Sequence, residues 1–459
     1  MKLLVLGGGL VGLATAALFA QNGHDVLLAE REEGRLGALR RGALPVVEPG
    51  LAELFFRYFG EGGGPGGGRI RAAGGIAEEE QQGAAAAFVC VGTPPGAGGA
   101  LDCGGVAEAA LSLCALPQSA PVVVRSTVNP ETPRLLEAAL RRAGRKNPLA
   151  LWPEFLAEGC ALAGALHPAR SVLGAQSEEV FALLSSLCPP GPVFCLSPEE
   201  AALAKLCANA YLAVRLAFFG EAADCCAALG ADYARVAAAV GADVRIGGRY
   251  LDALGGFGGS CLPKDTAALA SAAPMAVAEA ALRANALRLR RPLGALHRYY
   301  RSAAGLPIAV LGLAHKMGTD DCRASPGLLC AQALAEEGAK VRCYDPYVKS
   351  GPGKNCQTAR ECLQGACAAL VFLPLPELCA LRPEEWPAAM KEPLILDSAD
   401  ALDHAALSAA GAVCERLGRR AAGAAAQEGG FCGNAWVKIR PQTGLWQAAE
   451  AEQHHINGG

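Results

Sequence analysis

The chain has 459 residues, of which 52% are hydrophobic, and its formal net charge is −3. At roughly 150 residues per domain this length predicts about three domains, and the hydrophobic content predicts a globular protein. So small a net charge excludes proteins whose main partner is nucleic acid or an anionic membrane surface.

The 19 cysteines are scattered, with no CxxC pair and no cysteine–histidine grouping at the spacing of a zinc site. We interpret them as mostly small buried hydrophobes in a reducing cytoplasm, and we expect no metal. No apolar run reaches the ~18 residues of a membrane-spanning helix. Glycines within the first 20 residues argue against a signal peptide.

The chain begins with a strand, a glycine-rich turn, a helix and a second strand. An apolar run over residues 2–6 predicts the first strand, the segment to about Asn22 predicts a helix, and residues 24–29 predict the second strand. The turn at residues 7–12 reads G-G-G-L-V-G, which fits the pattern G-x-G-x-x-G. This arrangement is typical of a dinucleotide-binding fold.

The same turn predicts the contacts of a cofactor. Its glycines allow a tight turn and let a pyrophosphate lie on the helix N-terminus, while Glu30, 18 residues past the last glycine, can bind ribose hydroxyls. Glu30 favours NAD because its carboxylate would repel a 2′-phosphate, whereas Arg31 leaves NADP open. The predicted contacts are Gly7, Gly9, Leu10, Val11, Gly12, Glu30 and Arg31.

Two further strands end in turns that carry hydroxyl groups. Thr93 follows the apolar run at residues 88–92, and Thr127 follows the run at residues 122–124. Ligands bind at the carboxyl ends of strands in open parallel sheets, so both threonines are candidate ligand contacts. The alternative is that they only cap turns.

Residues 153–159 place two carboxylates, Glu154 and Glu158, four residues apart. On a helix they would share one face. The alternative is a solvated pair without a role.

A long helix is predicted from the capping box at residues 197–200 to about Leu229. Lys205 and Asn209 are four residues apart on it and therefore point the same way, among apolar neighbours. A lysine there either extends its ammonium to solvent or has a functional partner. The apolar circumference suits a spine between domains or a subunit interface.

Residues 258–265 bring a thiol, an amine and a carboxylate together after two glycines. We expect Lys264 to favour the thiolate of Cys261, because a nearby cation stabilises that form. The alternative is a polar loop with an incidental cysteine.

The last third of the chain predicts a second doubly wound α/β unit without a G-x-G-x-x-G turn. Charged side chains crowd its first turn, at residues 312–323, where they could hold phosphates or simply be solvated. From about Gly430 the tail looks poorly structured. The predicted strands cover residues 307–311, 340–344, 368–373 and 393–396.

Specific motifs occur in series along the chain. They are the glycine turn with Glu30, Glu48 to Leu51, Val91 to Pro94, Ser126 to Val128, Pro153 to Gly159, Lys205 with Asn209, Arg245 to Gly247, Phe257 to Asp265, Gly312 to Ala314 with Lys316, Thr319 to Asp321 with Arg323, and Tyr344 to Pro346. From Met1 to about Arg420 the chain therefore resembles the nucleotide-sugar dehydrogenases, in particular their UDP-glucose 6-dehydrogenase branch.

The resemblance implies an α/β fold with two Rossmann-like doubly wound domains, joined by a long central helix and a helical dimerisation region. It implies an NAD-binding domain at residues 1–196, a central region carrying the cysteine loop at 197–300, a domain binding the nucleotide sugar at 301–429 and a tail at 430–459. It also implies a homodimer or higher homo-oligomer.

The resemblance further implies a four-electron oxidation of a primary alcohol to a carboxylate with NAD. Cys261 would attack the aldehyde to form a thiohemiacetal, which a second oxidation would convert to a thioester. Lys205 would stabilise the oxyanion with the help of Asn209. For the hydrolysis, Thr127 and Asp265 would hold a water molecule, and either Glu154 or Glu158 would be the base.

Further contacts follow from the same resemblance. Thr93, Thr127, Lys264 and Arg323 would contact NAD. The nucleotide sugar would contact Glu154, Phe155, Leu156, Glu158, Lys205, Asn209, Arg245, Tyr250, Leu251, Gly258 and Lys316.

Substrate choice rests on short segments. Residues 263–265 resemble both the UDP-glucose and the GDP-mannose branches, and residues 245–251 look like the UDP-glucose type, so GDP-mannose is the alternative substrate. Four residues depart from the family pattern: Trp152, Gly220, Leu254 and Ala399. Trp152, Leu254 and Ala399 motivate a second alternative, a relative that binds the nucleotide sugar but turns it over poorly.

Overall fold

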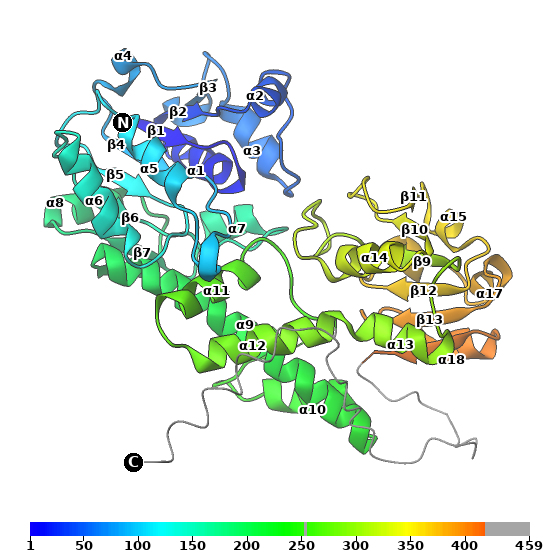
Figure 1. Ribbon diagram of the computed structural model, residues 1–459. Helices are drawn as coiled ribbons and strands as arrows, with labels where there is room; N and C mark the ends of the chain where they lie inside the picture. The colour runs from blue at the N-terminus through cyan, green and yellow to red at the C-terminus, as the bar shows by residue number, and fades with distance from the viewer. Residues whose placement is uncertain (252–254, 418–459) are drawn as a thin grey trace, which may run out of the picture. The chain divides into compact units, whose positions relative to one another are not determined.

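The computed structural model describes residues 1–251 and 255–417. Leu254 and the tail predicted at residues 430–459 therefore lie outside the described residues. The chain forms an α/β fold with two doubly wound sheets, as predicted, and Figure 1 labels their elements.

The N-terminal sheet has eight strands in the order β3-β2-β1-β4-β5-β6-β7-β8. All neighbours pair in parallel except β6 and β7. Because the strand order reverses between β1 and β4, the crevice of this sheet opens there, at the carboxyl ends of the strands. The strands are β1 (Lys2–Leu6), β2 (Asp25–Ala29), β3 (Arg69–Ala73), β4 (Ala86–Val89), β5 (Val122–Val124), β6 (Leu149–Leu151), β7 (Ser171–Gly174) and β8 (Val193–Leu196).

Helices cover both faces of this sheet, so its central strands are buried on both sides and read as continuous apolar runs. One face packs on α1 (Leu10–Gln21), α2 (Glu33–Arg40), α3 (Leu51–Tyr58), α7 (Ala161–Leu166) and α8 (Glu178–Leu187). The other face packs on α5 (Gly104–Leu111), α6 (Thr132–Arg142) and the first turn of α9 (Pro198–Leu229). The short α4 (Glu78–Gln81) and two 3-10 turns, Pro65–Gly67 and Ala97–Gly99, lie in the connections.

The central region is built on α9 (Pro198–Leu229), whose bounds agree with the prediction. Ser197 accepts a hydrogen bond from the Glu200 backbone, and the Glu200 side chain accepts one from the Ser197 backbone, so the predicted capping box is present. Helices α10 (Tyr233–Gly241), α11 (Leu262–Ala272) and α12 (Ala276–Leu289) pack against α9, and α13 (Arg291–Tyr299) follows them.

The C-terminal sheet is parallel, with the order β11-β10-β9-β12-β13-β14. Its order reverses between β9 and β12, which places the charged first turn beside its crevice. Its strands are β9 (Pro307–Leu311), β10 (Lys340–Tyr344), β11 (Lys354–Asn355), β12 (Ala368–Val371), β13 (Leu394–Asp397) and β14 (Val413–Arg416), and its helices are α14 (Pro326–Glu336), α15 (Ala359–Leu363), α16 (Pro376–Cys379), α17 (Glu385–Ala389) and α18 (His404–Ala409).

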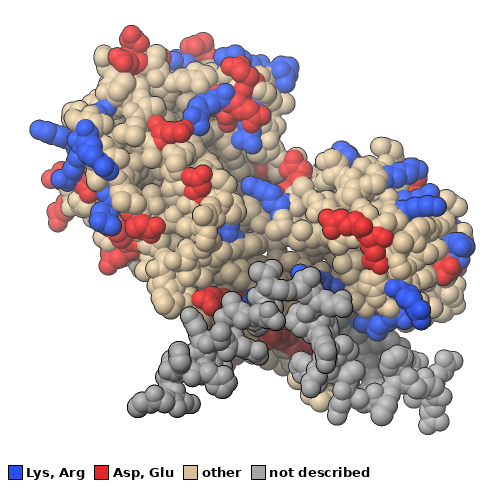
Figure 2. All heavy atoms as spheres, in the orientation of Figure 1, with Lys and Arg blue, Asp and Glu red and all other residues tan. Residues whose placement is uncertain are grey.

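The surface carries mixed charge. Figure 2 shows acidic and basic side chains interspersed on the face in view, as expected for a net charge of −3. In the described part of the chain, α9 alone is long and apolar enough to cross a membrane, and half of its most apolar stretch is buried inside the protein. The core helix of a soluble protein has the same properties.

Candidate active site

The crevice between β1 and β4 has the shape that a dinucleotide needs. Gly7 has a positive φ of 108°, which glycine adopts without strain. A Cβ atom at Gly12 would collide with the carbonyl oxygen of Gly7, so the third glycine lets α1 pack closely against β1. The backbone N–H of Gly8 donates to Oε2 of Glu30 at 2.9 Å and thereby holds this carboxylate beside the turn. These residues fit NAD.

The other predicted cofactor contacts lie around the same turn. Gly9 has open space where a Cβ atom would stand, and Leu10 and Val11 are half-buried at the start of α1. Arg31 is exposed and pairs with Glu108 at 3.4 Å. Its guanidinium is therefore already engaged by a carboxylate.

The threonines lie in the neighbouring turns, after β4 and β5. Both are buried, and the Thr93 hydroxyl donates to the carbonyl oxygen of Thr127 at 2.7 Å. This bond joins the two turns at the carboxyl edge of the sheet.

Lys205 is almost completely buried, with only 2% of its side chain exposed. Its ammonium donates to Oε1 of Glu154 at 3.2 Å, and the other oxygen of Glu154 accepts the N–H of Leu156 at 2.5 Å. Burial opposes the charge of Lys205, but Glu154, Cys261 and Asp265 outweigh it and raise its pKa. The lysine is therefore a fixed cation rather than a solvent-directed one.

Phe155 packs between cations. The ammonium of Lys205 lies 5.3 Å from its ring centre, and the guanidinium of Arg170 lies 4.1 Å from it.

Residues 152–157 form no helix, so Glu154 and Glu158 do not share a helix face as the spacing suggested. They point to different partners.

Cys261 stands at the N-terminal end of α11, where the helix dipole favours a thiolate. Asp265, in the first turn of α11, is fully buried. Its carboxylate accepts hydrogen bonds at 2.6 Å from both Asn209 and Lys264. Lys205 and Asn209 thus face the first turn of α11 from the same side of α9.

The charge around Cys261 differs from the expectation. Lys264 pairs with Asp265, and the cation that lowers the pKa of Cys261 is Lys205. Burial raises the pKa of the thiol by more than Lys205 lowers it, and the charges of Asp265 and Glu154 raise it further. The surroundings thus favour the thiol over the thiolate, and a base would help to form the nucleophile.

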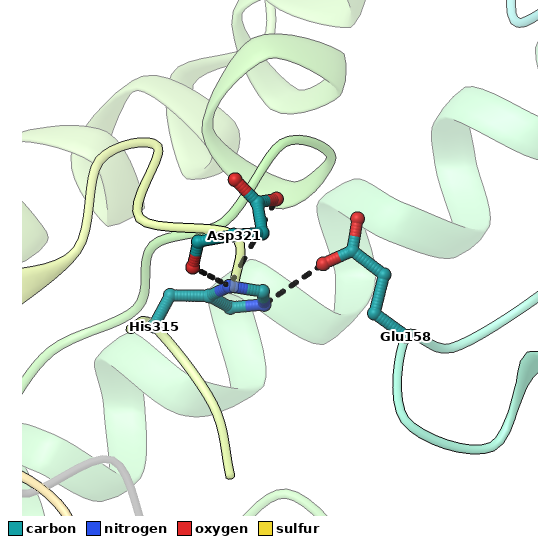
Figure 3. Close-up of side chains that lie close together, drawn as sticks. All are labelled: Glu158, His315 and Asp321. Carbon is teal, nitrogen blue, oxygen red and sulfur yellow. Dashed lines mark hydrogen bonds and ion pairs between the residues drawn. The ribbon is translucent and has the colours of Figure 1, made fainter. Parts of the chain in front are cut away.

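Glu158 joins the cysteine loop to the C-terminal domain. Its Oε1 accepts the Ser260 hydroxyl at 3.0 Å, and its Oε2 lies 3.5 Å from Nε2 of His315 (Figure 3). Arg323 lies 3.5 Å from the same carboxylate, and Lys316 donates to the Glu158 carbonyl oxygen at 3.0 Å. Burial and the charge of Asp321 raise the pKa of Glu158.

The two glycines before Cys261 bring the loop against the same turn. A Cβ atom at Gly258 would collide with the carbonyl oxygen of Ala324, and one at Gly259 would lie 2.7 Å from the His315 ring. Gly259 also donates its N–H to the Arg323 carbonyl oxygen at 2.9 Å. Only glycine allows this approach.

Two buried carboxylates hold the loops in place. Glu48 accepts backbone N–H groups of Gly159 at 2.9 Å and Ala161 at 2.7 Å, which fixes the end of the segment that carries Glu158. Asp345 accepts N–H groups of Leu313 at 2.8 Å and Ala314 at 3.0 Å, just before His315. Both are positioning residues.

Three predicted substrate contacts lie apart from this cluster. Arg245 is exposed and pairs with Asp243 at 2.6 Å, and Tyr250 has a positive φ of 60°. Leu251 is buried, and its carbonyl oxygen accepts the Tyr233 hydroxyl. Within residues 1–251 and 255–417, the structure gives no contact between these three residues and Cys261.

The amino-acid sequence matches three family models. They are the NAD-binding domain of the UDP-glucose/GDP-mannose dehydrogenase family at residues 1–190, its central domain at 199–289 and its UDP-binding domain at 309–404. Together these cover most of the chain. The chain belongs to the UDP-glucose/GDP-mannose dehydrogenase family. Its cofactor is accordingly NAD, and it is an NAD-dependent dehydrogenase of nucleotide sugars.

Individual relatives of the family match over nearly their whole length. The UDP-glucose 6-dehydrogenase of Haloferax volcanii is 36% identical over 86% of this chain and 96% of its own length, and that of Pseudomonas aeruginosa is 32% identical over 92% and 98%. The solved UDP-glucose dehydrogenase of Pyrobaculum islandicum has 31% identity and a TM-score of 0.79, and covers 91% of this chain and 98% of its own.

Two departures from the family pattern have a structural explanation. The Trp152 ring packs in the core against Phe19 and Phe88, with the Arg125 guanidinium 4.6 Å from its centre. Arg288 occupies the space beside Gly220 and donates to its carbonyl oxygen. Both substitutions are accommodated by packing.

Ala399, which also departs from the family pattern, lines a cavity. With Leu251 and residues of α10 it lines a space of about 590 Å³. The predicted substrate contact Leu251 and the departure Ala399 thus line the same cavity.

Some residues at the site were not predicted as site residues. Ser260 and His315 carry no local signal, because a serine in a loop and a histidine in a turn are common. Glu158, His315 and Asp321 also have the side-chain types and the spacing to hold a metal ion, which the sequence did not suggest.

Proposed function

We propose that this protein is a UDP-glucose 6-dehydrogenase, which oxidises UDP-glucose to UDP-glucuronate. The observation that carries the proposal is the buried Lys205 ammonium. Its charge favours the thiolate of Cys261, and it donates a hydrogen bond to Glu154. A thiol beside a fixed cation suits the covalent capture of an aldehyde. The names of the relatives from Haloferax volcanii and Pseudomonas aeruginosa support the choice of UDP-glucose.

The N-terminal domain would hold NAD, which would supply the hydride acceptor for both oxidations. The glycine turn at residues 7–12 and Glu30 hold the cofactor, while Thr93, Thr127, Lys264 and Arg323 are its further proposed contacts. Glu30 selects NAD, because a 2′-phosphate beside its carboxylate would be repelled. Per sugar, the reaction consumes two NAD and one water and releases two NADH and three protons.

Cys261 forms the covalent intermediate. Its sulfur attacks the aldehyde carbon, and the charge that develops on the carbonyl oxygen is stabilised by Lys205 and Asn209. One preorganised donor of this kind contributes about 3–4 kcal/mol. Because the aldehyde stays bound to the sulfur, it is not lost between the two oxidations.

Hydrolysis of the thioester needs a water molecule and a base. Thr127 and Asp265 hold the water. Glu158 is the proposed base rather than Glu154, because Glu154 is occupied by Lys205 and by the Leu156 backbone, whereas Oε2 of Glu158 is buried without a hydrogen-bond partner. Phe155, Leu156, Gly258 and Lys316 shape the proposed sugar site, and Arg245, Tyr250 and Leu251 are its outlying contacts.

The stoichiometry of NADH tests the proposed function. We expect two NADH for each UDP-glucose consumed and at least ~10-fold lower kcat/KM with GDP-mannose, since unpaired polar groups in a site strongly disfavour the wrong ligand. UDP-N-acetylmannosamine is a necessary comparison, because a solved dehydrogenase of this sugar from Pyrococcus horikoshii also has a TM-score of 0.79, at 26% identity. Binding of NAD without NADH from any sugar would instead support an impaired relative.

We propose a homodimer in the cytoplasm. All described cysteines are free thiols, as in a reducing compartment. Tyr211 and Phe218 on α9 are each 62% exposed, and Val277 and Leu287 on α12 are 64% and 70% exposed. Tyr211 and Phe218 are seven residues apart, so they share one helix face, and such a patch marks an interface.

Charges on this face should separate the subunits. We expect the double substitution Tyr211→Asp and Phe218→Asp to give a monomer, because two carboxylates cannot be buried without partners. Size-exclusion chromatography with light scattering measures the mass, and circular dichroism confirms that the helices remain. Leu135→Asp, at another exposed apolar position, is the control and should leave the mass unchanged. A wild-type mass retained by the double variant would rule out this face.

A further inference from the structure

We propose that Ser260 and His315, together with Glu158, form a proton relay that deprotonates Cys261. The inference rests on the proposed function for the role of Cys261 as nucleophile. It assigns a role to two residues that the sequence did not single out. His315 acts through Glu158 and is a positioning residue, whereas Ser260 contacts the sulfur itself.

The first step of the relay is the contact between Cys261 and Ser260. Their Sγ and Oγ atoms are 3.4 Å apart. The single hydroxyl proton of Ser260 is donated to Oε1 of Glu158 at 3.0 Å. Ser260 can therefore only accept from the thiol, so the proton of Cys261 points toward Ser260 Oγ. In the described chain this is the one hydrogen bond to that sulfur.

The second step is the pair of Glu158 and His315 (Figure 3). Nδ1 of His315 lies 3.0 Å from the carbonyl oxygen of Asp321, which can only accept, so Nδ1 carries a hydrogen. In the neutral ring Nε2 is then a lone pair, and it faces Oε2 of Glu158 at 3.5 Å. Two acceptors face each other, and Oε2 has no hydrogen-bond donor. The pair is built to take up one proton.

Charges on every side fit this assignment. Glu158 also faces Arg323 at 3.5 Å and the carboxylate of Asp321, and His315 faces Asp321 with Nδ1 3.9 Å from Oδ2. On the other side of the sulfur, Lys205 stabilises the thiolate. Lys316 bonds the Glu158 carbonyl oxygen.

A proton fits the cluster better than a metal ion. Arg323 binds the Asp321 carboxylate at 2.7 Å and also approaches Glu158, so a guanidinium already balances the two acids. A divalent cation would be repelled by Arg323. Nδ1 of His315 is engaged with a carbonyl oxygen, which leaves Nε2 for a single partner.

The transfer is balanced. The S–H bond of Cys261 breaks as the thiol proton passes to Ser260 Oγ, while the Ser260 proton passes to Glu158. The carboxyl group of Glu158 then turns so that the proton bound to Oε1 faces Nε2 of His315, and this O–H bond breaks as one N–H bond forms. The products are a thiolate near Lys205 and an imidazolium paired with Glu158. The thiolate is ready to attack the aldehyde, and no electrons are transferred.

The experiment measures the thiolate directly, in the protein without NAD or sugar. Iodoacetamide labelling of Cys261 is followed across pH by mass spectrometry of the tryptic peptide 250–264, in which Cys261 is the single cysteine. Wild-type protein should label in two phases, of which the lower-pH phase reports the thiolate–imidazolium pair. His315→Gln keeps a hydrogen-bonding side chain but cannot take the proton, so this phase should vanish. Labelling at neutral pH should fall about tenfold for each unit by which the apparent pKa of Cys261 rises.

Three further variants make the result decisive. Ser260→Ala should lose the same phase, and the double variant should lose no more than either single one, because both residues act in one path. His297→Gln is the matched control, since His297 pairs with Glu337 at 3.2 Å outside the cluster and should leave the profile unchanged. Unchanged profiles in either single variant, or additive losses in the double variant, would overturn the relay. Lack of NADH formation would count against the proposed function but not against the relay.

Discussion

Cys261→Ser should remove the turnover of UDP-glucose almost completely, by at least about 10⁴-fold in kcat, as found when a hydrolase loses its nucleophile. Serine keeps the size of the side chain, but its hydroxyl ionises far less readily than a thiol, even with a base nearby. Burial at this position opposes ionisation further, since it already raises the pKa of the Cys261 thiol. Surroundings that already disfavour ionisation of a thiol disfavour ionisation of a serine hydroxyl even more.

Steady-state NADH absorbance measures the loss, and calorimetry measures whether NAD still binds. NAD affinity should stay near the wild-type value, because the glycine turn at residues 7–12 and Glu30 belong to another part of the chain. Cys114→Ser, an exposed cysteine of the N-terminal domain, should have wild-type kcat. A Cys261→Ser protein that still forms two NADH per sugar would exclude covalent catalysis through this residue.

Lys205→Met should lower kcat by about 10²–10³-fold, which corresponds to the loss of about 3–4 kcal/mol of oxyanion stabilisation. Methionine fills a similar volume without the charge. The substitution has a second effect, because Glu154 is left buried without its cation. Breaking one side of a buried ion pair destabilises a protein by about 3–5 kcal/mol.

The two effects can be separated by a second substitution. In Lys205→Met with Glu154→Gln neither member of the buried ion pair keeps a charge, so the melting temperature should recover toward the wild-type value. Turnover should not recover, because the cation is still missing. If the double variant recovered both stability and kcat, Lys205 would only neutralise Glu154. The same conclusion would follow if Lys205→Met alone kept kcat within threefold of the wild-type value.

Local signals predicted the fold well. The strands at residues 2–6, 122–124, 307–311 and 340–344 have the predicted bounds, because buried parallel strands read as apolar runs ended by glycine or polar residues. The strands β3, β6, β7, β8, β11 and β14 were not predicted. β7 reads Ser-Val-Leu-Gly, so it is not a continuous apolar run although all four residues are buried. β8 reads Val-Phe-Cys-Leu, but this apolar run is only four residues long and is largely exposed.

The candidate site was predicted residue by residue but not as a network. Spacing placed Lys205 and Asn209 on one helix face, yet it could not show that Lys264 pairs with Asp265 instead of Cys261. It also could not show that Glu158 and His315, 157 positions apart, face each other. Such contacts depend on how distant loops pack, and a single sequence carries no signal of that.

The close approach of Gly258 to Ala324 has a consequence for the growing chain. Synthesis completes the sheet of the N-terminal domain at Leu196, so the cofactor crevice can form while the remainder is still being made. The cysteine loop obtains its last support later, since the turn against which Gly258 and Gly259 rest ends only at Ser325. During synthesis the glycine turn and Glu30 thus precede the last support of the cysteine loop, and a chain that stops before Ala324 lacks the backbone against which Gly258 packs.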